Sequence, residues 1–226
     1  MGLPDTVLRV DLTEGRVTTE AVPPSWRRDF IGGKGLGARY LYEEVVPEID
    51  PLDPENVLCL FRGPFSGYLP GETRYVAITK SPLTGLFVDS YSGGSFADAF
   101  VGALGEHAGL LIEGRAPGSV AIIVEDATAT ITDAEDRWGL DVRELDASFD
   151  GAVAGIGPAG ESSVRYATIA TDGGDHHAGR GGTGAVMGVK RLKAVVARGT
   201  PPERADLEAV RDRYASRFEA TPEGRA

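Results

Sequence analysis

The feature that most restricts the fold of this sequence is a series of three short words that occurs twice in the same order. The first series is Gly63–Gly67, Arg74–Thr79 and Ser92–Gly94. The second series is Gly157–Gly160, Arg165–Ala170 and Gly181–Gly184. Self-similarity at a regular spacing indicates a duplicated structural unit. We therefore expect a pseudo-twofold domain in which each half offers a glycine loop to one shared site, and this expectation fails if the halves differ in structure.

Short apolar runs separated by glycine and proline predict an α+β fold. Hairpins are expected over 7–22 and over 120–131, the second with its turn at Glu125-Asp126. Further strands are expected at 57–62, 75–79, 86–89, 110–113, 164–170 and 192–197, and helices at 26–31, 36–46, 95–104, 141–149 and 203–218. In the last of these helices an apolar stripe, formed by Leu207, Val210, Tyr214 and Phe218, indicates a missing partner surface.

Composition excludes several classes of function. The formal net charge of -11 argues against nucleic acid as a partner. No apolar stretch has the length of a membrane span and the first residues lack the order of a signal peptide, so we expect a cytoplasmic protein. Cys59 is the only cysteine, so this chain alone forms no disulfide, thiolate zinc site or iron-sulfur cluster. Any redox centre must come from a cofactor or a partner.

The densest candidate for ligand binding is the segment His177–Gly188. Glycines allow main-chain N–H groups to approach an anion closely, and a helix that begins near Thr183 would direct its positive end toward that anion. The segment lacks the lysine of a phosphate-binding P-loop and the spacing of a dinucleotide fingerprint. From the residues alone, phosphate binding and a tight structural turn are equal alternatives.

A second small-residue segment, Asp89–Phe96, also precedes an expected helix. Alone, it is typical of a helix that begins with a serine cap. Together with the first segment it indicates two anion sites, which suit a ligand with two phosphates or two phosphorylated ligands. Arg74 could contribute a bidentate phosphate contact, the alternative being a surface ion pair.

Three other motifs are assigned structural roles. The turn Lys80–Gly85 is set by its proline and glycine. Gly32–Gly37 follows a helix and not a strand, so we interpret it as a helix connection and not as a nucleotide loop. His176 and His177 are adjacent and point in different directions, which favours a solvated loop over a metal site. No arrangement of serine, histidine and acid indicates a catalytic residue.

Two long words, Arg74–Gly85 and Ala178–Gly188, resemble the first domain of the tungsten aldehyde:ferredoxin oxidoreductase family. The resemblance extends from the opening hairpin to about Gly199 and includes Gly157–Glu161. It implies a domain of two β-sheets with helices, on which a tungsten or molybdenum bis-pterin cofactor sits. The metal is held by the sulfurs of the pterins, so the lack of further cysteines does not oppose cofactor binding.

The resemblance also implies which residues serve the cofactor. Arg74, Tyr91, Ser92 and Gly93 are expected at one pterin, and Ala178, Gly179, Gly181 and Gly182 at the other. Magnesium is expected through main-chain carbonyls near Tyr91 and Gly179, with no side-chain ligand. Family members often have asparagine where Tyr91 stands, and only a main-chain contact would survive that difference.

The family's reaction implies that aldehydes become carboxylic acids and that the electrons pass through a cluster to ferredoxin. On this interpretation residues 1–200 form the cofactor-binding domain, and residues 201–226 begin a linker or helix toward absent domains that hold the 4Fe-4S cluster. The expected partners are that remaining polypeptide, ferredoxin and the aldehyde, with a homodimer also considered, and neither nucleic acid nor membrane. The alternatives are a non-enzymatic module that binds a pterin or another phosphorylated ligand, and a truncated, inactive remnant.

Overall fold

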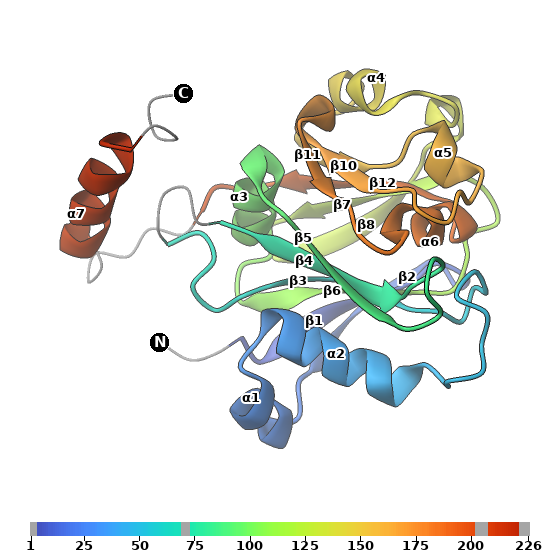
Figure 1. Cartoon of the computed structure of the whole chain (residues 1–226), viewed down its shortest axis with the longest axis horizontal. Coiled ribbons are helices and arrows are strands. Elements are labelled where there is room, and N and C mark those ends of the chain that lie inside the picture. Colours follow the sequence, from blue (N-terminus) through green and yellow to red (C-terminus); the bar gives the residue numbers. More distant parts are fainter. Residues whose placement is uncertain (1–3, 69–72, 202–207, 222–226) are drawn as a thin grey trace.

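The computed structural model describes residues 4–68, 73–201 and 208–221, and their strands form two six-stranded sheets (Figure 1). The first sheet contains β1 (Thr6–Asp11), β2 (Arg16–Ala21), β3 (Leu58–Arg62), β4 (Tyr75–Lys80), β5 (Phe87–Ser92) and β6 (His107–Glu113). The second contains β7 (Val120–Glu125), β8 (Thr128–Asp133), β9 (Ala152–Gly155), β10 (Ile169–Thr171), β11 (His176–Ala178) and β12 (Leu192–Arg198). The helices are α1 (Pro24–Phe30), α2 (Gly33–Glu44), α3 (Gly94–Ala103), α4 (Val142–Ala147), α5 (Pro158–Glu161), α6 (Thr183–Val189) and α7 (Glu208–Glu219), with short 3-10 turns at Glu135–Arg137 and Asp172–Gly174.

The two sheets have the same topology. Their strand orders are β2-β1-β6-β3-β4-β5 and β8-β7-β12-β9-β10-β11, so each strand of one sheet has a counterpart in the other. In both halves the last strand returns parallel to the first strand of the hairpin, while the other pairs are antiparallel. The repeated words occupy equivalent places, because Gly93 and Gly182 are the residues that cap α3 and α6. The predicted α+β class and internal duplication are confirmed.

The main hydrophobic core lies between the two sheets, where α3 and α6 are also packed (Figure 1). Phe96 and Phe100 of α3 and Met187 of α6 are fully buried there. The helices α1 and α2 cover the outer face of the first sheet, and α4 covers the outer face of the second. Burial of these apolar surfaces supplies most of the stabilising free energy. The same burial fixes the positions of α3 and α6. The residues at the start of each helix are candidates for contact with a ligand.

The local sequence explains where several elements begin. The β7–β8 hairpin turns at Asp126 and Ala127, which both have positive φ, as a two-residue turn between twisted strands requires. The turn therefore lies one residue later than predicted. Helix α4 begins after Asp141, whose carboxylate accepts hydrogen bonds from two main-chain N–H groups in a capping box with Glu144.

The structure corrects three predictions of local structure. Of the expected strand 164–170, only residues 169 and 170 are extended, because Val164 closes the turn after α5 by donating its N–H to the Ala159 carbonyl. The segment Gly32–Gly37 is expected from the sequence to connect two helices, but helix α2 already begins within it, at Gly33. Strand β5 continues to Ser92, so most of the second candidate loop is the end of a strand.

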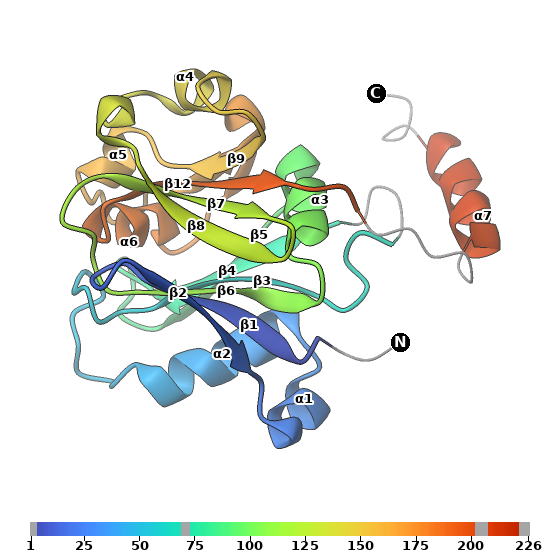
Figure 2. The same cartoon turned by 180° about the vertical axis from the view of Figure 1, so that it is seen from behind.

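Helix α7 stands apart from the two sheets in both views (Figures 1 and 2). Val210 is exposed, whereas Leu207 of the predicted stripe lies outside the described residues. The helices in the described ranges are all too short or too polar to cross a bilayer.

A buried lysine links the two halves. The Nζ atom of Lys190, at the end of α6, donates to the carbonyl oxygens of Pro54 at 2.9 Å and Gly114 at 3.0 Å, both in the first half. Burial lowers the pKa of this ammonium group to about 7, although Glu113 and Glu55 act in the opposite direction.

We predict that Lys190→Met removes a pH-dependent part of the stability. Between the folded pKa near 7 and an unfolded pKa of about 10.4, the unfolded state binds one more proton, so the free energy of unfolding rises with pH by about 1.4 kcal/mol per unit. Urea denaturation of both proteins should show the wild type gaining about 2 to 3 kcal/mol on the variant from pH 7.5 to 9.5. A difference that stays constant would mean that folded Lys190 is charged throughout this range.

Candidate functional site at the seam between the sheets

The edge strands β5 and β11 of the two sheets lie side by side (Figure 1). We call this line of contact the seam. The N–H group of Arg180 donates to the Ser90 hydroxyl at 2.8 Å. A Cβ atom added to Gly181 would lie 2.4 Å from the side chain of Val88. The Gly181 backbone therefore lies so close to the Val88 side chain that a residue with a Cβ atom would not fit without a shift.

The seam brings the two candidate loops together. Gly94 meets His176, while further along Ser90 meets Arg180, so the two strands run in opposite directions. Tyr91–Ser92 therefore lies opposite Ala178–Gly179. We call Tyr91–Gly94 the first loop and Ala178–Gly182 the second loop. Residues separated by almost 90 positions in the chain thus form one continuous surface at the seam.

The second loop leaves several main-chain donors unpaired. Within the described ranges, no group accepts a hydrogen bond from the N–H of Gly179, Gly181 or Gly182. Gly182 has the left-handed conformation, with φ of 80° and ψ of 29°, and a Cβ there would lie 2.0 Å from the Arg165 carbonyl oxygen. Unpaired N–H groups beside a helix start are suited to an anion.

The first loop is flanked by an arginine. A Cβ on Gly93 would lie 2.7 Å from Nη1 of Arg74, so this side chain runs directly along the loop. The same Nη1 atom donates to the Thr73 carbonyl at 2.9 Å, and the residue is exposed. Beneath the loop the hydroxyls of Ser92 and Tyr75 are buried, and neither has a hydrogen-bond partner among the described residues. Burial raises the pKa of Tyr75 above its ordinary value, so this hydroxyl stays protonated.

The start of α3 is closed by a carboxylate from the other half. Asp172, in the turn before β11, accepts the Ser95 N–H at 3.1 Å through Oδ1 and also contacts the Ser95 hydroxyl. Its Oδ2 atom lies 3.1 Å from Nδ1 of His176. The two helix starts are therefore different, because α6 has no carboxylate of this kind in the described structure.

The electrostatics around the seam oppose the overall charge of the chain. Arg74, Arg165 and Arg180 are exposed, and none of them forms an ion pair with a described residue. Arg165 occupies the place of Arg74 in the second repeat and donates only to the Pro82 carbonyl at 3.4 Å. Within a chain of net charge -11, these arginines place positive charge beside both loops. Unpaired arginines beside both loops create a local site for an anion.

Sequence reasoning found most of this surface but missed three residues. The eight predicted cofactor residues all lie at the seam or against it. Asp172, Ser81 and Arg165 were missed, although the repeat itself places Arg165 in register with Arg74. Ser81 is fully buried and donates its hydroxyl to the Gly181 carbonyl at 2.7 Å. Ser81 lies in the Lys80–Gly85 turn, to which the sequence assigns a structural role, and Asp172 lies in no motif. The contacts of both residues cross the seam.

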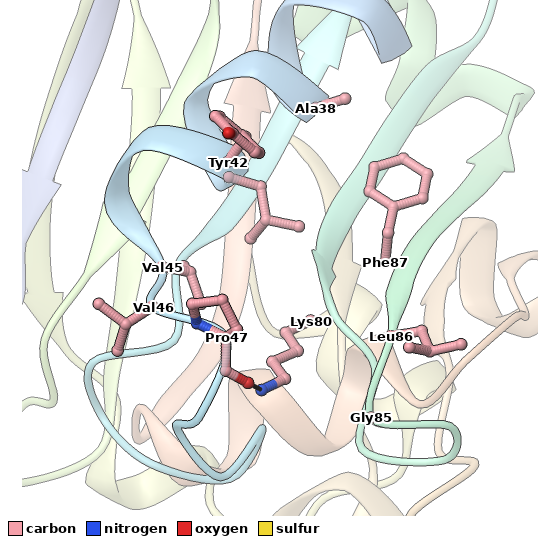
Figure 3. A pocket seen from close by; sticks show the side chains of 10 residues that line it. Ala38, Tyr42, Val45, Val46, Pro47, Lys80, Gly85, Leu86 and Phe87 are labelled. Atoms are coloured by element: carbon pink, nitrogen blue, oxygen red, sulfur yellow. Dashed lines mark hydrogen bonds between the residues drawn. The ribbon is translucent and has the colours of Figure 1, made fainter.

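An apolar hollow of about 360 Å³ lies on the other side of the β4–β5 hairpin, against α2 (Figure 3). Tyr42, Val46 and Phe87 are among its walls. Lys80 also lines it, but its ammonium group donates to the carbonyls of Pro47 and Ile49. The hollow contains none of the predicted cofactor residues and is distinct from the seam.

Comparison with known proteins identifies the family of the chain. The pattern of the family described as aldehyde ferredoxin oxidoreductase, N-terminal domain, matches residues 7–199. The chain belongs to the aldehyde ferredoxin oxidoreductase family. The tungsten-containing aldehyde ferredoxin oxidoreductase of Pyrococcus abyssi is 41% identical over 204 residues, which are 85% of this chain and 33% of that protein. The chain therefore spans about a third of the length of the curated relatives that it matches.

Relatives with other names share the same region. The WOR-like subunit of an aliphatic sulfonate oxidoreductase from Pyrococcus furiosus is 34% identical over 218 residues, covering 87% of this chain and 34% of that protein. A solved structure of the BamBC active site complex of benzoyl coenzyme A reductase, with 1,5 dienoyl-CoA, matches with a TM-score of 0.84. That match has 32% identity and covers 97% of this chain and 35% of the other. The fold of this chain is thus shared by a protein with a different named reaction.

We predict that two glycines of the second loop differ in their effect on stability. Gly182→Ala should lower the free energy of unfolding by about 3 kcal/mol or more. The alanine would have to adopt the left-handed backbone conformation, and its Cβ atom would clash with the Arg165 carbonyl oxygen. Gly179→Ala should change it by less than about 0.5 kcal/mol, since the nearest atom to the new Cβ is 3.8 Å away. Urea denaturation measures both, and equal losses would contradict the geometry of the loop.

Proposed function

We propose that the seam binds a tungsten or molybdenum cofactor with two phosphorylated pterins. The observation that carries this proposal is the set of unpaired N–H groups on the second loop, together with the unpaired arginines beside both loops. Such groups suit phosphates, which accept several hydrogen bonds at once. The name of the Pyrococcus abyssi relative, a tungsten-containing enzyme, supports the choice of cofactor.

Each loop would hold one pterin. Arg74 and the main chain of Tyr91–Gly93 would contact the first, and the N–H groups of Gly179, Gly181 and Gly182 the phosphate of the second. Ala178 would contribute its main chain. A magnesium ion would bind through the main-chain carbonyls of Tyr91 and Gly179, with no side-chain ligand.

The residues of this chain fit a metal that is held by its organic cofactor. In the described ranges, no group of three or more histidine, cysteine, aspartate or glutamate residues is arranged to hold a metal ion. Cys59 is buried, and burial raises the pKa of its thiol, so it is no thiolate ligand. When bound, the cofactor would supply the two-electron chemistry, while this chain binds and orients it.

The reaction that we propose is the oxidation of an aldehyde to a carboxylic acid, with electrons passing to ferredoxin through a 4Fe-4S cluster. The cluster would be held by a polypeptide that corresponds to the other two thirds of the relatives. Residues 1–200 would be the cofactor-binding domain and residues 201–226 the start of the connection to that polypeptide. The name of the Pyrococcus abyssi relative, a tungsten-containing aldehyde ferredoxin oxidoreductase, supports this assignment.

We predict that Arg74→Met lowers cofactor content without unfolding the protein. The exposed guanidinium would contact a phosphate or the pterin, and the loss of one charge-assisted contact weakens binding by about tenfold or more. The chain should be co-expressed with the remaining polypeptide in a host that makes the cofactor, and tungsten and molybdenum measured per chain by mass spectrometry.

The matched control is Arg143→Met, which removes another exposed arginine, on α4 and outside both loops. It should leave the metal content unchanged. Absence of both metals from the complete wild-type assembly would refute the proposed function. Binding of a pterin by this chain without oxidoreductase activity in the complete assembly would support a non-enzymatic binding module instead.

A further inference from the structure

Each half contacts the glycine loop of the other half through one polar side chain. The two side chains differ, because one is a hydroxyl that donates and the other is a carboxylate that accepts. The turn between β4 and β5 supplies Ser81, which donates to the Gly181 carbonyl at 2.7 Å. The equivalent turn between β10 and β11 supplies Asp172, which accepts from the Ser95 N–H at 3.1 Å. Ser81 therefore contacts a carbonyl and leaves the N–H groups of the second loop free, whereas Asp172 occupies an N–H group at the start of α3.

Asp172 takes the place that an anion would take at this helix start. Helix α3 has ten residues and receives no side-chain hydrogen bond from its own capping residue, Gly93. A Cβ on Gly94 would lie 1.8 Å from Oδ2 of Asp172, so the carboxylate is packed tightly against the first turn. A negative group at this end is stabilised by the helix dipole and by the N–H contact.

Three further groups hold the carboxylate in place. The Thr171 hydroxyl donates to Oδ2 at 3.3 Å, Nδ1 of His176 lies 3.1 Å from the same oxygen, and the Ser95 hydroxyl contacts Oδ1. The side chain of Asp172 is only 16% exposed. Its backbone has a φ of 53°, which costs about 1 kcal/mol for a residue other than glycine and which these contacts offset. The carboxylate is thus fixed at α3.

We propose that Asp172 is a specificity-determining residue that closes the α3 end of the seam to phosphate. This inference rests on the proposed function of the seam as a site for phosphorylated pterins. Phosphate then binds at the second loop, where Gly181 and Gly182 have free N–H groups, and at Arg74 on the first loop. The two halves share one topology but are not equivalent as anion sites. A second phosphate at Ser95 is excluded by repulsion from the fixed carboxylate and by its volume.

The test is a titration of the full chain with inorganic pyrophosphate, followed by amide chemical shifts in nuclear magnetic resonance spectra. In the wild type, the amides of Gly181 and Gly182 should shift, while that of Ser95 should not. In Asp172→Gly, which accepts the positive φ without strain, the Ser95 amide should shift as well, with an affinity at that end at least about fivefold higher than in the wild type.

Two variants serve as controls. Asp172→Asn keeps a hydrogen-bond acceptor for the Ser95 N–H and caps a helix about as well as aspartate, so a smaller gain is expected. Asp175→Asn changes the same charge on the exposed end of the same turn, and it should behave as the wild type.

The outcomes separate this inference from the proposed function. A shift of the Ser95 amide in the wild type, or no shift in either Asp172 variant, would overturn the role of Asp172. Amides of Gly181 and Gly182 that do not respond in any protein would instead count against the phosphate site of the second loop. A gain at Ser95 in Asp172→Gly, absent from Asp175→Asn, supports the inference in either case.

Discussion

The close approach of β5 to β11 is the constraint on which the site depends. Gly181 lies against Val88 and Gly94 against Asp172, at distances that leave no room for a side chain on either glycine. Because these contacts join two sheets of identical topology, the loops before α3 and α6 meet along one line. A larger residue at either position would have to displace Val88 or Asp172, both of which lie at this contact. Gly181 therefore serves both the packing of the halves and, through its unpaired N–H group, the proposed contact with the ligand.

The sequence predicted the fold at the level of its repeat. The paired words place Gly93 and Gly182 at equivalent helix starts, and Arg74 and Arg165 at equivalent strand or turn positions. The hydrophobic pattern of the sequence led to wrong predictions where contacts with other segments decide the local structure. Val164–Thr168 alternates like a strand, yet it forms a turn because α5 ends directly before it. Strands β9 and β11 are only four and three residues long, too short for a pattern to predict.

In the candidate site, too, some residues could be predicted from the local sequence and others could not. Arg74 and the glycines of both loops carry a local signal, since guanidinium and glycine have few alternatives in anion binding. Asp172 carries none, because Thr171-Asp172-Gly173-Gly174 has the composition of any turn, and the Lys80–Gly85 turn that contains Ser81 indicates a structural role alone. Their roles arise from contacts across the seam, 77 residues apart for Asp172 and Ser95 and 100 apart for Ser81 and Gly181. Only the packing of the two sheets reveals that the halves differ as anion sites.

The central claim is that two loops from two related halves act on one cofactor with two pterins. Its most direct measurement is the number of pterins released from the assembled protein, determined after oxidation to their fluorescent derivatives and compared with metal and protein content. The account predicts two pterins and one tungsten or molybdenum atom for each copy of this chain. One pterin for each chain, at full metal occupancy, would contradict it, because one of the two loops would then have no ligand.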